Sequence, residues 1–396
     1  METGSSTATK MNDETLSIQH DWHLELKEPV SQFYLGIKPT GANKTQYFDC
    51  KITKLVDEHG FAVMPGEGPI KSSEFSKFSL DEQNRLSITF QNRKTTFVSS
   101  SKEWTMMENG SAPRTFDVSS TGGTMVAANA MGDLVVMGTE RTDIYKDLCG
   151  HVMDIYRCQF FPSGLVVLGG GMDCRIRIWA IDTGLCVRTL EGHKGAITGL
   201  GTIDVGKDII SCSNDGTAKI WNCGSAGIQN SWDFQKGKCV DLAVSEDSSR
   251  FAVICEENHL SIINLHGNKD KKKIPLPSEP SSLCFSSDAS VVFVGFENGH
   301  VAAWKEGKMI GEILTGKGRV NSLKFHRNRL IVAFNDGGVY AYFTPSLQNS
   351  DSTTISAEYV MTGANCDPVY DLAIHGDNVY TTCRDGKIRM YKLNLE

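Results

Sequence analysis

A unit that recurs after 42 residues limits the fold of this 396-residue chain more than any other feature. Asp173 and the tryptophan six positions after it return 42 residues later as Asp215 and Trp221. The pair Gly150-His151 moves by the same interval and returns as Gly192-His193. Landmarks that shift together indicate a structural repeat rather than an isolated glycine-rich loop.

Looser copies that keep the turn position extend this repeat along the chain. The turn residues of the resulting units are Met131, Asp173, Asp215, Asn258, Asn298, Asp336 and Asp385. A period of about 40 to 45 residues with a Gly-His pair and a strand that ends in Trp is typical of WD40 repeats, each a four-stranded blade. The sequence therefore predicts an all-β protein, a seven-bladed WD40 β-propeller with a small β-rich N-terminal domain.

The last unit is too short to supply a fourth strand, because only five residues follow Tyr391. An open ring would leave backbone groups unpaired, so a strand from elsewhere must close it. Counting back two periods from the fourth strand of the second unit selects Lys102 to Met107. We expect deletion of this segment to lower the melting temperature by many degrees.

The residues before the repeats are expected to divide into a disordered tail, 1–17, and a β-rich domain, 18–100. In this domain "WHLELK", "FDCKIT" and "RLSITF" alternate apolar and polar residues, which indicates strands. The propeller is then expected to occupy 101–396, with its closing strand at about 102–107.

Composition excludes several classes of protein. The net charge of −7 argues against a general nucleic-acid binder, and no apolar run is long enough to span a membrane. The N-terminus lacks the apolar core of a signal peptide. The 12 cysteines are scattered singly, without a Cys-x-x-Cys pair, so we expect no metal, no cofactor and a reducing compartment, the cytoplasm and also the nucleus. We expect the chain to be a monomer on its own.

One set of residues resembles a catalytic triad but is expected to be structural. His193, Ser211, Asp215 and Trp221 fall where WD40 blades carry a hydrogen-bonded tetrad. The set is in register with the repeat, and an indole N–H is available to cap it. In the preceding unit Gly169 replaces the serine, which predicts an incomplete tetrad there.

Two other patterns are given structural interpretations. Gly201–Lys207 and Gly311–Lys317 have the glycine and lysine spacing of a phosphate loop, but Asp208 and Gly318 stand where Ser or Thr is needed, and both stretches lie in predicted β-turn regions. The basic stretch 268–273, "NKDKKK", is expected to be a solvated loop, with an import signal or a contact for an acidic partner as the alternative.

Acidic residues are predicted to gather on one rim of the ring, because equivalent turns of all blades emerge on the same side. This candidate partner-binding rim comprises Glu256, Glu257, Glu297, Asp173, Asp336 and Asp385. Converging acids would create a negative potential that speeds association with a basic domain. The alternative is a solvated surface without a partner.

Particular strings resemble one family within the WD40 proteins, the proteasomal ATPase-associated factors. The strings are "FFPSGLVVLGGGMD" (160–173), "EGHKG" (191–195), "DGTAKIWNCG" (215–224) and "TGANCDPVY" with "YTTCRDGKIRMYKL" (362–393). The resemblance is strong over 150–224 and 360–393 and weak elsewhere. The first repeat departs from the pattern, because it carries Met131 and Met137 in place of the turn residue and the tryptophan.

This resemblance implies a non-enzymatic protein that binds the C-terminal domain of a proteasomal ATPase subunit while the base of the regulatory particle assembles, and restrains its premature docking. It further implies that an acidic propeller face meets a basic ATPase surface. The alternative is a WD40 adaptor or substrate receptor for another complex such as a cullin ubiquitin ligase. The Trp-Asp-x-Arg sequence common in such receptors is missing after both Trp179 and Trp221.

Overall fold

A computed structural model describes most of the chain. The described residues are 9–13, 15–25, 30–38, 46–54, 61–65, 75–81, 83, 85–90, 93–107, 111–140, 144–234, 237–266, 271–345 and 354–394. Strands dominate this part, and the longest α-helix in it is α1 (Trp22–Glu25). Within these ranges no helix has the length and apolar character needed to cross a membrane.

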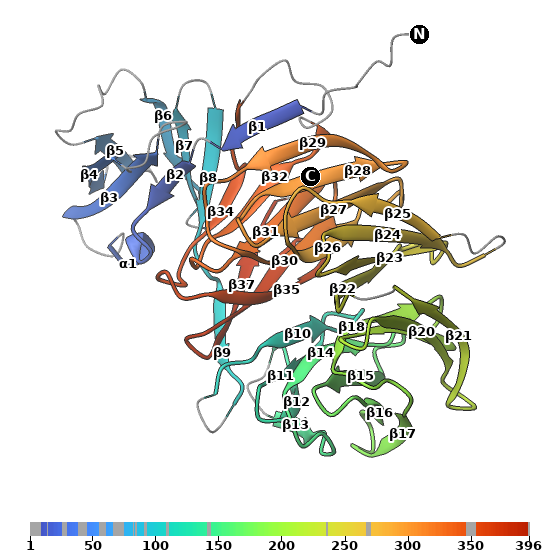
Figure 1. Ribbon diagram of the computed structural model, residues 1–396. Helices are drawn as coiled ribbons and strands as arrows, with labels where there is room; N and C mark the ends of the chain where they lie inside the picture. Colours follow the sequence, from blue (N-terminus) through green and yellow to red (C-terminus); the bar gives the residue numbers. More distant parts are fainter. Residues whose placement is uncertain are drawn as a thin grey trace, which may run out of the picture.

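Seven four-stranded antiparallel units follow one another around a ring, as the repeat predicts (Figure 1). We number these blades 1 to 7 in chain order. The strands of blades 1 and 2 are β10 (Thr115–Val118), β11 (Thr124–Ala128), β12 (Leu134–Gly138), β13 (Ile144–Asp147), β14 (Ile155–Phe160), β15 (Val166–Gly171), β16 (Ile176–Ala180) and β17 (Cys186–Leu190). Those of blades 3 and 4 are β18 (Ile197–Ile203), β19 (Asp208–Ser213), β20 (Thr217–Asn222), β21 (Gly227–Asp233), β22 (Cys239–Val244), β23 (Arg250–Cys255), β24 (His259–Asn264) and β25 (Lys271–Pro275).

Of the other three blades, blade 5 keeps simple chain order, whereas blades 6 and 7 contain strands that break it. Blade 5 consists of β26 (Pro280–Phe285), β27 (Val291–Phe296), β28 (Val301–Lys305) and β29 (Lys308–Leu314), and blade 6 of β30 (Val320–His326), β31 (Arg329–Phe334), β32 (Val339–Phe343) and β34 (Tyr359–Met361). Blade 7 consists of β35 (Val369–His375), β36 (Asn378–Cys383), β37 (Lys387–Lys392) and β9 (Lys102–Thr105). The all-β, seven-bladed architecture is therefore confirmed.

The blades pack face to face, and burial along their strands follows from this arrangement. In blade 3 the second strand, β19, is buried over five of its six residues, whereas the outermost strand, β21, is mostly exposed. One apolar cluster joins Ile210 and Ile220 of blade 3 to Phe251 and Val253 of blade 4. Strands near the axis have a neighbouring blade on each face, so they carry apolar residues on both sides.

The ring is closed by a strand from the N-terminal side of the propeller. β9 pairs antiparallel with β37, and Trp104 stands opposite Ile388. This strand lies inside the segment 102–107 that the missing fourth strand selects. Closure is reinforced at the axis, where the carboxylate of Asp371 in blade 7 accepts hydrogen bonds of 3.2 Å from the Thr115 hydroxyl and the Phe116 amide in blade 1.

The segment that precedes the ring is divided differently from the expectation. β2 (Thr15–Ile18), β3 (Val30–Lys38), β4 (Gln46–Lys54) and β5 (Phe61–Pro65) form a sheet of their own beside the propeller (Figure 1). β6 (Phe75–Leu80), β7 (Arg85–Phe90) and β8 (Arg93–Val98) instead extend blade 6, because β8 runs parallel to β34. Of the three alternating segments, "FDCKIT" lies in β4 and "RLSITF" is β7, but "WHLELK" begins with α1.

Part of the expected tail is structured as well. β1 (Thr9–Asp13) runs parallel to β29 and to β33 (Thr354–Ile355), which differs from a disordered segment over 1–17. Pairing with the outer edge of blade 5 orders this stretch, and the sequence of the tail carries no sign of that edge. Residues 1–8 lie outside the described part, as do 268–270 of the basic stretch, whereas Lys271–Lys273 belong to β25.

The N-terminal sheet packs against the ring through a shared apolar core. Trp22 and Phe33 are fully buried in a cluster with Tyr340 of blade 6 and Ile355. The indole N–H of Trp22 donates a 3.1 Å hydrogen bond to the hydroxyl of Thr362, directly after β34. Burial of two large aromatic side chains fixes this sheet to blade 6.

Candidate functional site

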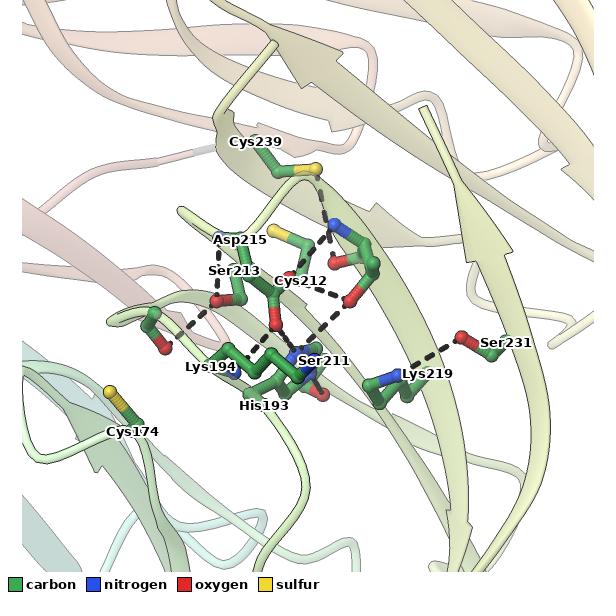
Figure 2. A network of polar contacts seen from close by, with 12 residues as sticks. Cys174, His193, Lys194, Ser211, Cys212, Ser213, Asp215, Lys219, Ser231 and Cys239 are labelled. Carbon is green, nitrogen blue, oxygen red and sulfur yellow. Dashed lines mark hydrogen bonds and ion pairs between the residues drawn. The ribbon is translucent and has the colours of Figure 1, made fainter. Parts of the chain in front are cut away.

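Blade 3 contains the tetrad that the repeat predicts, and the structure brings all four residues together. His193 Nδ1 lies 2.9 Å from Asp215 Oδ2, and His193 Nε2 lies 2.8 Å from Ser211 Oγ (Figure 2). The indole N–H of Trp221 donates a 2.8 Å hydrogen bond to the same hydroxyl. The four side chains thereby tie the loop that enters the blade to its second and third strands.

Burial and hydrogen bonding assign this tetrad to the framework. The Ser211 side chain is fully buried, so a substrate has no access to its hydroxyl. Partial burial of Asp215 opposes ionisation, but hydrogen bonds from His193, Thr217 and the Lys194 amide outweigh it and hold the pKa of the carboxyl well below its usual range. The ionised carboxylate of Asp215 therefore anchors the His193 loop.

Blade 2 carries an incomplete version of the same tetrad. His151 Nδ1 lies 2.8 Å from Asp173 Oδ2, but Gly169 offers no hydroxyl to His151 Nε2. This nitrogen is buried and has no hydrogen-bond partner among the described residues. The Trp179 indole instead donates to the carbonyl of Cys149 at 3.0 Å.

The acidic residues singled out in the sequence all occupy turns between the second and third strands of their blades. Corresponding strands run in the same direction in every blade, so these turns lie on one edge of the ring, together with the His151 and His193 loops. We call this edge the histidine rim. Asp173 belongs to blade 2, Glu256 and Glu257 to blade 4, Glu297 to blade 5, Asp336 to blade 6 and Asp385 to blade 7.

Basic side chains neutralise much of this charge. Glu256 pairs with Lys238 at 3.3 Å, and Glu297 pairs with Arg319 at 3.1 Å. Asp385 is held by Arg389, and Asp173 lies 4.0 Å from the guanidinium of Arg177. Within the described part of the chain, Glu257 and Asp336 are the members of the set without an ion pair. The sequence reveals the acids because they recur at turns, but it does not reveal which cations reach them.

The axis of the ring contains charged groups that the repeat pattern did not single out. On the histidine rim the channel opens into a cavity of about 310 Å³, whose lining includes Arg114, Arg319 and Tyr370. Deeper in the channel, Arg157 donates to Asp241 at 2.9 Å. A second cavity along the channel, of about 410 Å³, is lined in part by Asp117, and burial raises the pKa of this carboxyl to about 6. These residues lie on the first strands of their blades or directly before them, where the turn-based repeat carries no signal.

The comparisons with known proteins agree with this geometry. A family model described as "WD domain, G-beta repeat" matches residues 142–180 and 184–222. The chain is a WD40-repeat protein. Each matched stretch covers the outer strand of one blade and the first three strands of the next, β13 to β16 and β17 to β20. Because each sequence repeat contributes strands to two blades, it connects one blade covalently to the next.

Several curated proteins are similar to about half of this chain. "26S proteasome regulatory subunit RPN14" of Saccharomyces cerevisiae is 27% identical over 214 residues, which are 46% of this chain and 51% of that protein. "Autophagy-related protein 16" of Arabidopsis thaliana is 23% identical over 213 residues, 52% of this chain and 41% of that protein. "CCR4-associated factor 4 homolog" of Candida glabrata is 24% identical over 215 residues, 50% and 32% of the two chains. The chain thus spans about half, or less, of the length of these relatives.

No group of three or more His, Cys, Asp or Glu side chains in the described ranges is placed to hold a metal ion. The cysteines whose side chains are described carry free thiols. Burial raises the pKa of the thiols at Cys158 and Cys284. A thiol with a raised pKa is a weak nucleophile, so these cysteines fill the core.

Proposed function

We propose that this WD40 protein is a non-catalytic assembly chaperone or regulator of the proteasome regulatory-particle base. In this proposal it binds the C-terminal domain of a proteasomal ATPase subunit in the cytoplasm or nucleus, as a monomer. Two observations support it: the strings at 160–224 and 362–393 that resemble the ATPase-associated factors, and the similarity to a protein named as a proteasome regulatory subunit.

The surface we assign to this contact is the acidic part of the histidine rim. The observation that supports this assignment is a pair of adjacent exposed glutamates in one turn, Glu256 and Glu257. Glu256 pairs with Lys238, whereas Glu257 has no ion pair within the described residues. Unlike Asp173 and Asp215, they do not tie a histidine loop to its blade. Surface acids without a framework role are available to a basic partner.

A binding measurement with two charge-reversal variants tests this assignment. Glu256→Lys with Glu257→Lys is expected to weaken binding to purified C-terminal domains of the proteasomal ATPases, and to flatten the dependence of the affinity on salt, with folding intact. Fluorescence anisotropy at low and at physiological ionic strength measures both quantities.

The matched control changes charge equally on the opposite edge of the ring. Glu246 and Glu306 are exposed residues in the turns there, in blades 4 and 5. Glu246→Lys with Glu306→Lys is expected to retain most of the affinity. Equal affinities for the two double variants would rule out the rim as the contact surface.

A second candidate is an adaptor role in another assembly. The relative named for autophagy matches a share of this chain similar to that matched by the proteasome subunit. Affinity purification of the tagged chain from cell extract, followed by mass spectrometry, separates the candidates. Proteasomal ATPases support the first function, and cullin adaptors or autophagy proteins without ATPases support the second.

A further inference from the structure

Four large apolar side chains are exposed at one corner of the histidine rim, where blades 1 and 2 meet. The exposed fractions are 66% for Met131, 78% for Val152, 48% for Met153 and 50% for Met172. We call these four residues the apolar corner. Single exposed apolar residues are ordinary on protein surfaces, whereas a contiguous group usually marks an interaction site.

Backbone contacts show that the segments carrying these residues are neighbours. A Cβ at Gly132, next to Met131, would lie 3.1 Å from the carbonyl oxygen of Met153. The amide of Met172 donates a 2.8 Å hydrogen bond to the carbonyl of Asp154. The turns of blades 1 and 2 therefore flank the His151 loop and present one continuous surface.

The repeat itself shows that the fold does not require apolar residues here. The positions 42 residues after Val152, Met153 and Met172 are occupied in blade 3 by Lys194, Gly195 and Asn214. Blade 3 is a complete WD40 blade with polar or small residues at each of these positions. The apolar side chains of blade 2 thus have no framework purpose that blade 3 shares.

A cavity of about 390 Å³ adjoins the apolar corner. The apolar part of its lining comes from Met106, Met107, Met131, Leu134, Val135 and Leu148. Asp133 and Asp147 are its acidic residues, and neither lysine nor arginine is among the described residues that line it. The cavity is therefore suited to a large apolar side chain with a basic group beside it.

We propose that the apolar corner and its cavity bind an amphipathic segment of a partner protein, with an apolar side chain inserted in the cavity and basic residues near Asp133 and Asp147. Methionine supports such a role, because its unbranched, polarisable side chain adapts to differently shaped apolar groups. The site lies on the same rim as the acidic residues but on different blades.

Synthetic peptides test the chemistry of the site directly. The probe is a helical peptide of about 15 residues, four turns, with leucines at i, i+3, i+4 and i+7 and lysines elsewhere. One control peptide replaces leucine by alanine, and another replaces lysine by glutamate. Fluorescence anisotropy with the full chain is expected to give at least about tenfold tighter binding for the Leu/Lys peptide than for either control.

Protein variants locate the peptide. Val152→Gln with Met172→Asn leaves the net charge unchanged and places polar residues where blade 3 already has them, so folding is expected to be retained. This variant is expected to bind the Leu/Lys peptide at least about tenfold more weakly. The matched control is Leu165→Gln with Leu185→Gln on the opposite edge of blade 2, where the two leucines are 70% and 65% exposed. It is expected to bind like the unmodified protein.

Three results would overturn the proposal. The Ala/Lys peptide would bind as tightly as the Leu/Lys peptide if the attraction were purely electrostatic. The control variant would lose as much affinity as Val152→Gln with Met172→Asn if the peptide bound apolar surface without preference. Sedimentation would show a dimer of the unmodified chain, and a monomer of that variant, if the apolar corner were a contact between two copies.

Discussion

Glu103 and Arg389 are 286 residues apart in the sequence, yet the Arg389 guanidinium donates a 3.1 Å hydrogen bond to the Glu103 carboxylate across the seam of the ring. Lys387 donates to the same carboxylate at 2.8 Å, and Arg389 also binds Asp385 on the histidine rim. The closing strand is thus linked by charge to the last turn of the rim. Arg389 is thus shared between an acid of the closing strand and an acid of the last rim turn.

The closing strand is expected to contribute a large share of ring stability through Trp104. This side chain is 5% exposed, and its ring stacks on Tyr380 with centroids 6.2 Å apart. Trp104→Ala is expected to cost about 3 to 5 kcal/mol of unfolding free energy, which lowers the melting temperature by roughly 6 to 15 °C. Differential scanning calorimetry measures the shift. Leu165→Ala, at an exposed position, serves as the control, and equal melting temperatures would contradict the closure.

The tetrad in blade 3 is expected to stabilise the fold through Ser211. Ser211→Ala removes the acceptor of the Trp221 indole and the partner of His193 Nε2, and each stranded buried group costs about 1 to 3 kcal/mol. We expect a loss of at least about 2 kcal/mol in urea unfolding. Ser225→Ala, at an exposed position, is the control. An equally small change in the free energy of unfolding for both variants would show that the tetrad does not stabilise the fold.

A hydroxyl that completes the tetrad of blade 2 is expected to increase the stability of the protein. A Cβ at Gly169 would lie 3.2 Å from the Trp179 ring and 3.4 Å from His151 Nε2, so any side chain there meets the same crowding. The difference between Gly169→Ser and Gly169→Ala isolates the hydroxyl. We expect the serine variant to be the more stable of the two by about 0.5 to 1.5 kcal/mol, measured by urea unfolding. A serine variant no more stable than the alanine variant would refute this.

Asp117 is expected to make stability depend on pH in the acidic range. Burial raises its pKa from 3.8 to about 6, so the folded state favours the protonated acid. The contribution of Asp117 to the free energy of unfolding is therefore largest below about pH 4, falls as the pH rises to about 6 and is constant above that. Relative to the unmodified protein, Asp117→Asn is expected to gain up to about 3 kcal/mol between pH 4 and pH 7. Urea titrations at both pH values measure this, and a constant difference would contradict it.

Removal of the cations that neutralise the rim is expected to strengthen binding to a basic partner, whereas Glu256→Lys with Glu257→Lys is expected to weaken it. Lys238→Gln with Arg319→Gln leaves Glu256 and Glu297 without their basic partners. If the rim binds a basic ATPase domain, affinity at low salt is expected to increase roughly three- to tenfold, with a smaller increase at high salt. Lys305→Gln with Lys308→Gln on the opposite edge of blade 5 is the matched control. Unchanged affinity for the rim variant would argue against the charge model.

The ring was predictable because its signal is periodic. A turn residue six positions before a tryptophan, and a Gly-His pair, recur at 42 residues because each blade needs the same turn and the same anchor. The incomplete tetrad at Gly169 followed from the same register. The closing strand was predictable by counting, because two periods before the fourth strand of the second unit lies the segment that contains β9.

The N-terminal segment and the channel were not predictable in the same way. β1 and β8 run parallel to outer strands of blades 5 and 6, and parallel pairing between distant segments has no local turn signal. Trp22 lies in a short helix although its flanking residues alternate, because packing against blade 6 decides its conformation. Arg157 contacts Asp241 although the two residues are 84 positions apart in the sequence, because the first strands of all blades line the same central channel.

The pairing of β1 with β29 and of β8 with β34 has a practical consequence for anyone who shortens this protein. A fragment that begins at the first propeller strand would expose two bare sheet edges, and such edges recruit strands from other molecules into aggregates. Expression trials should therefore start ahead of Thr9 rather than at the repeat boundary.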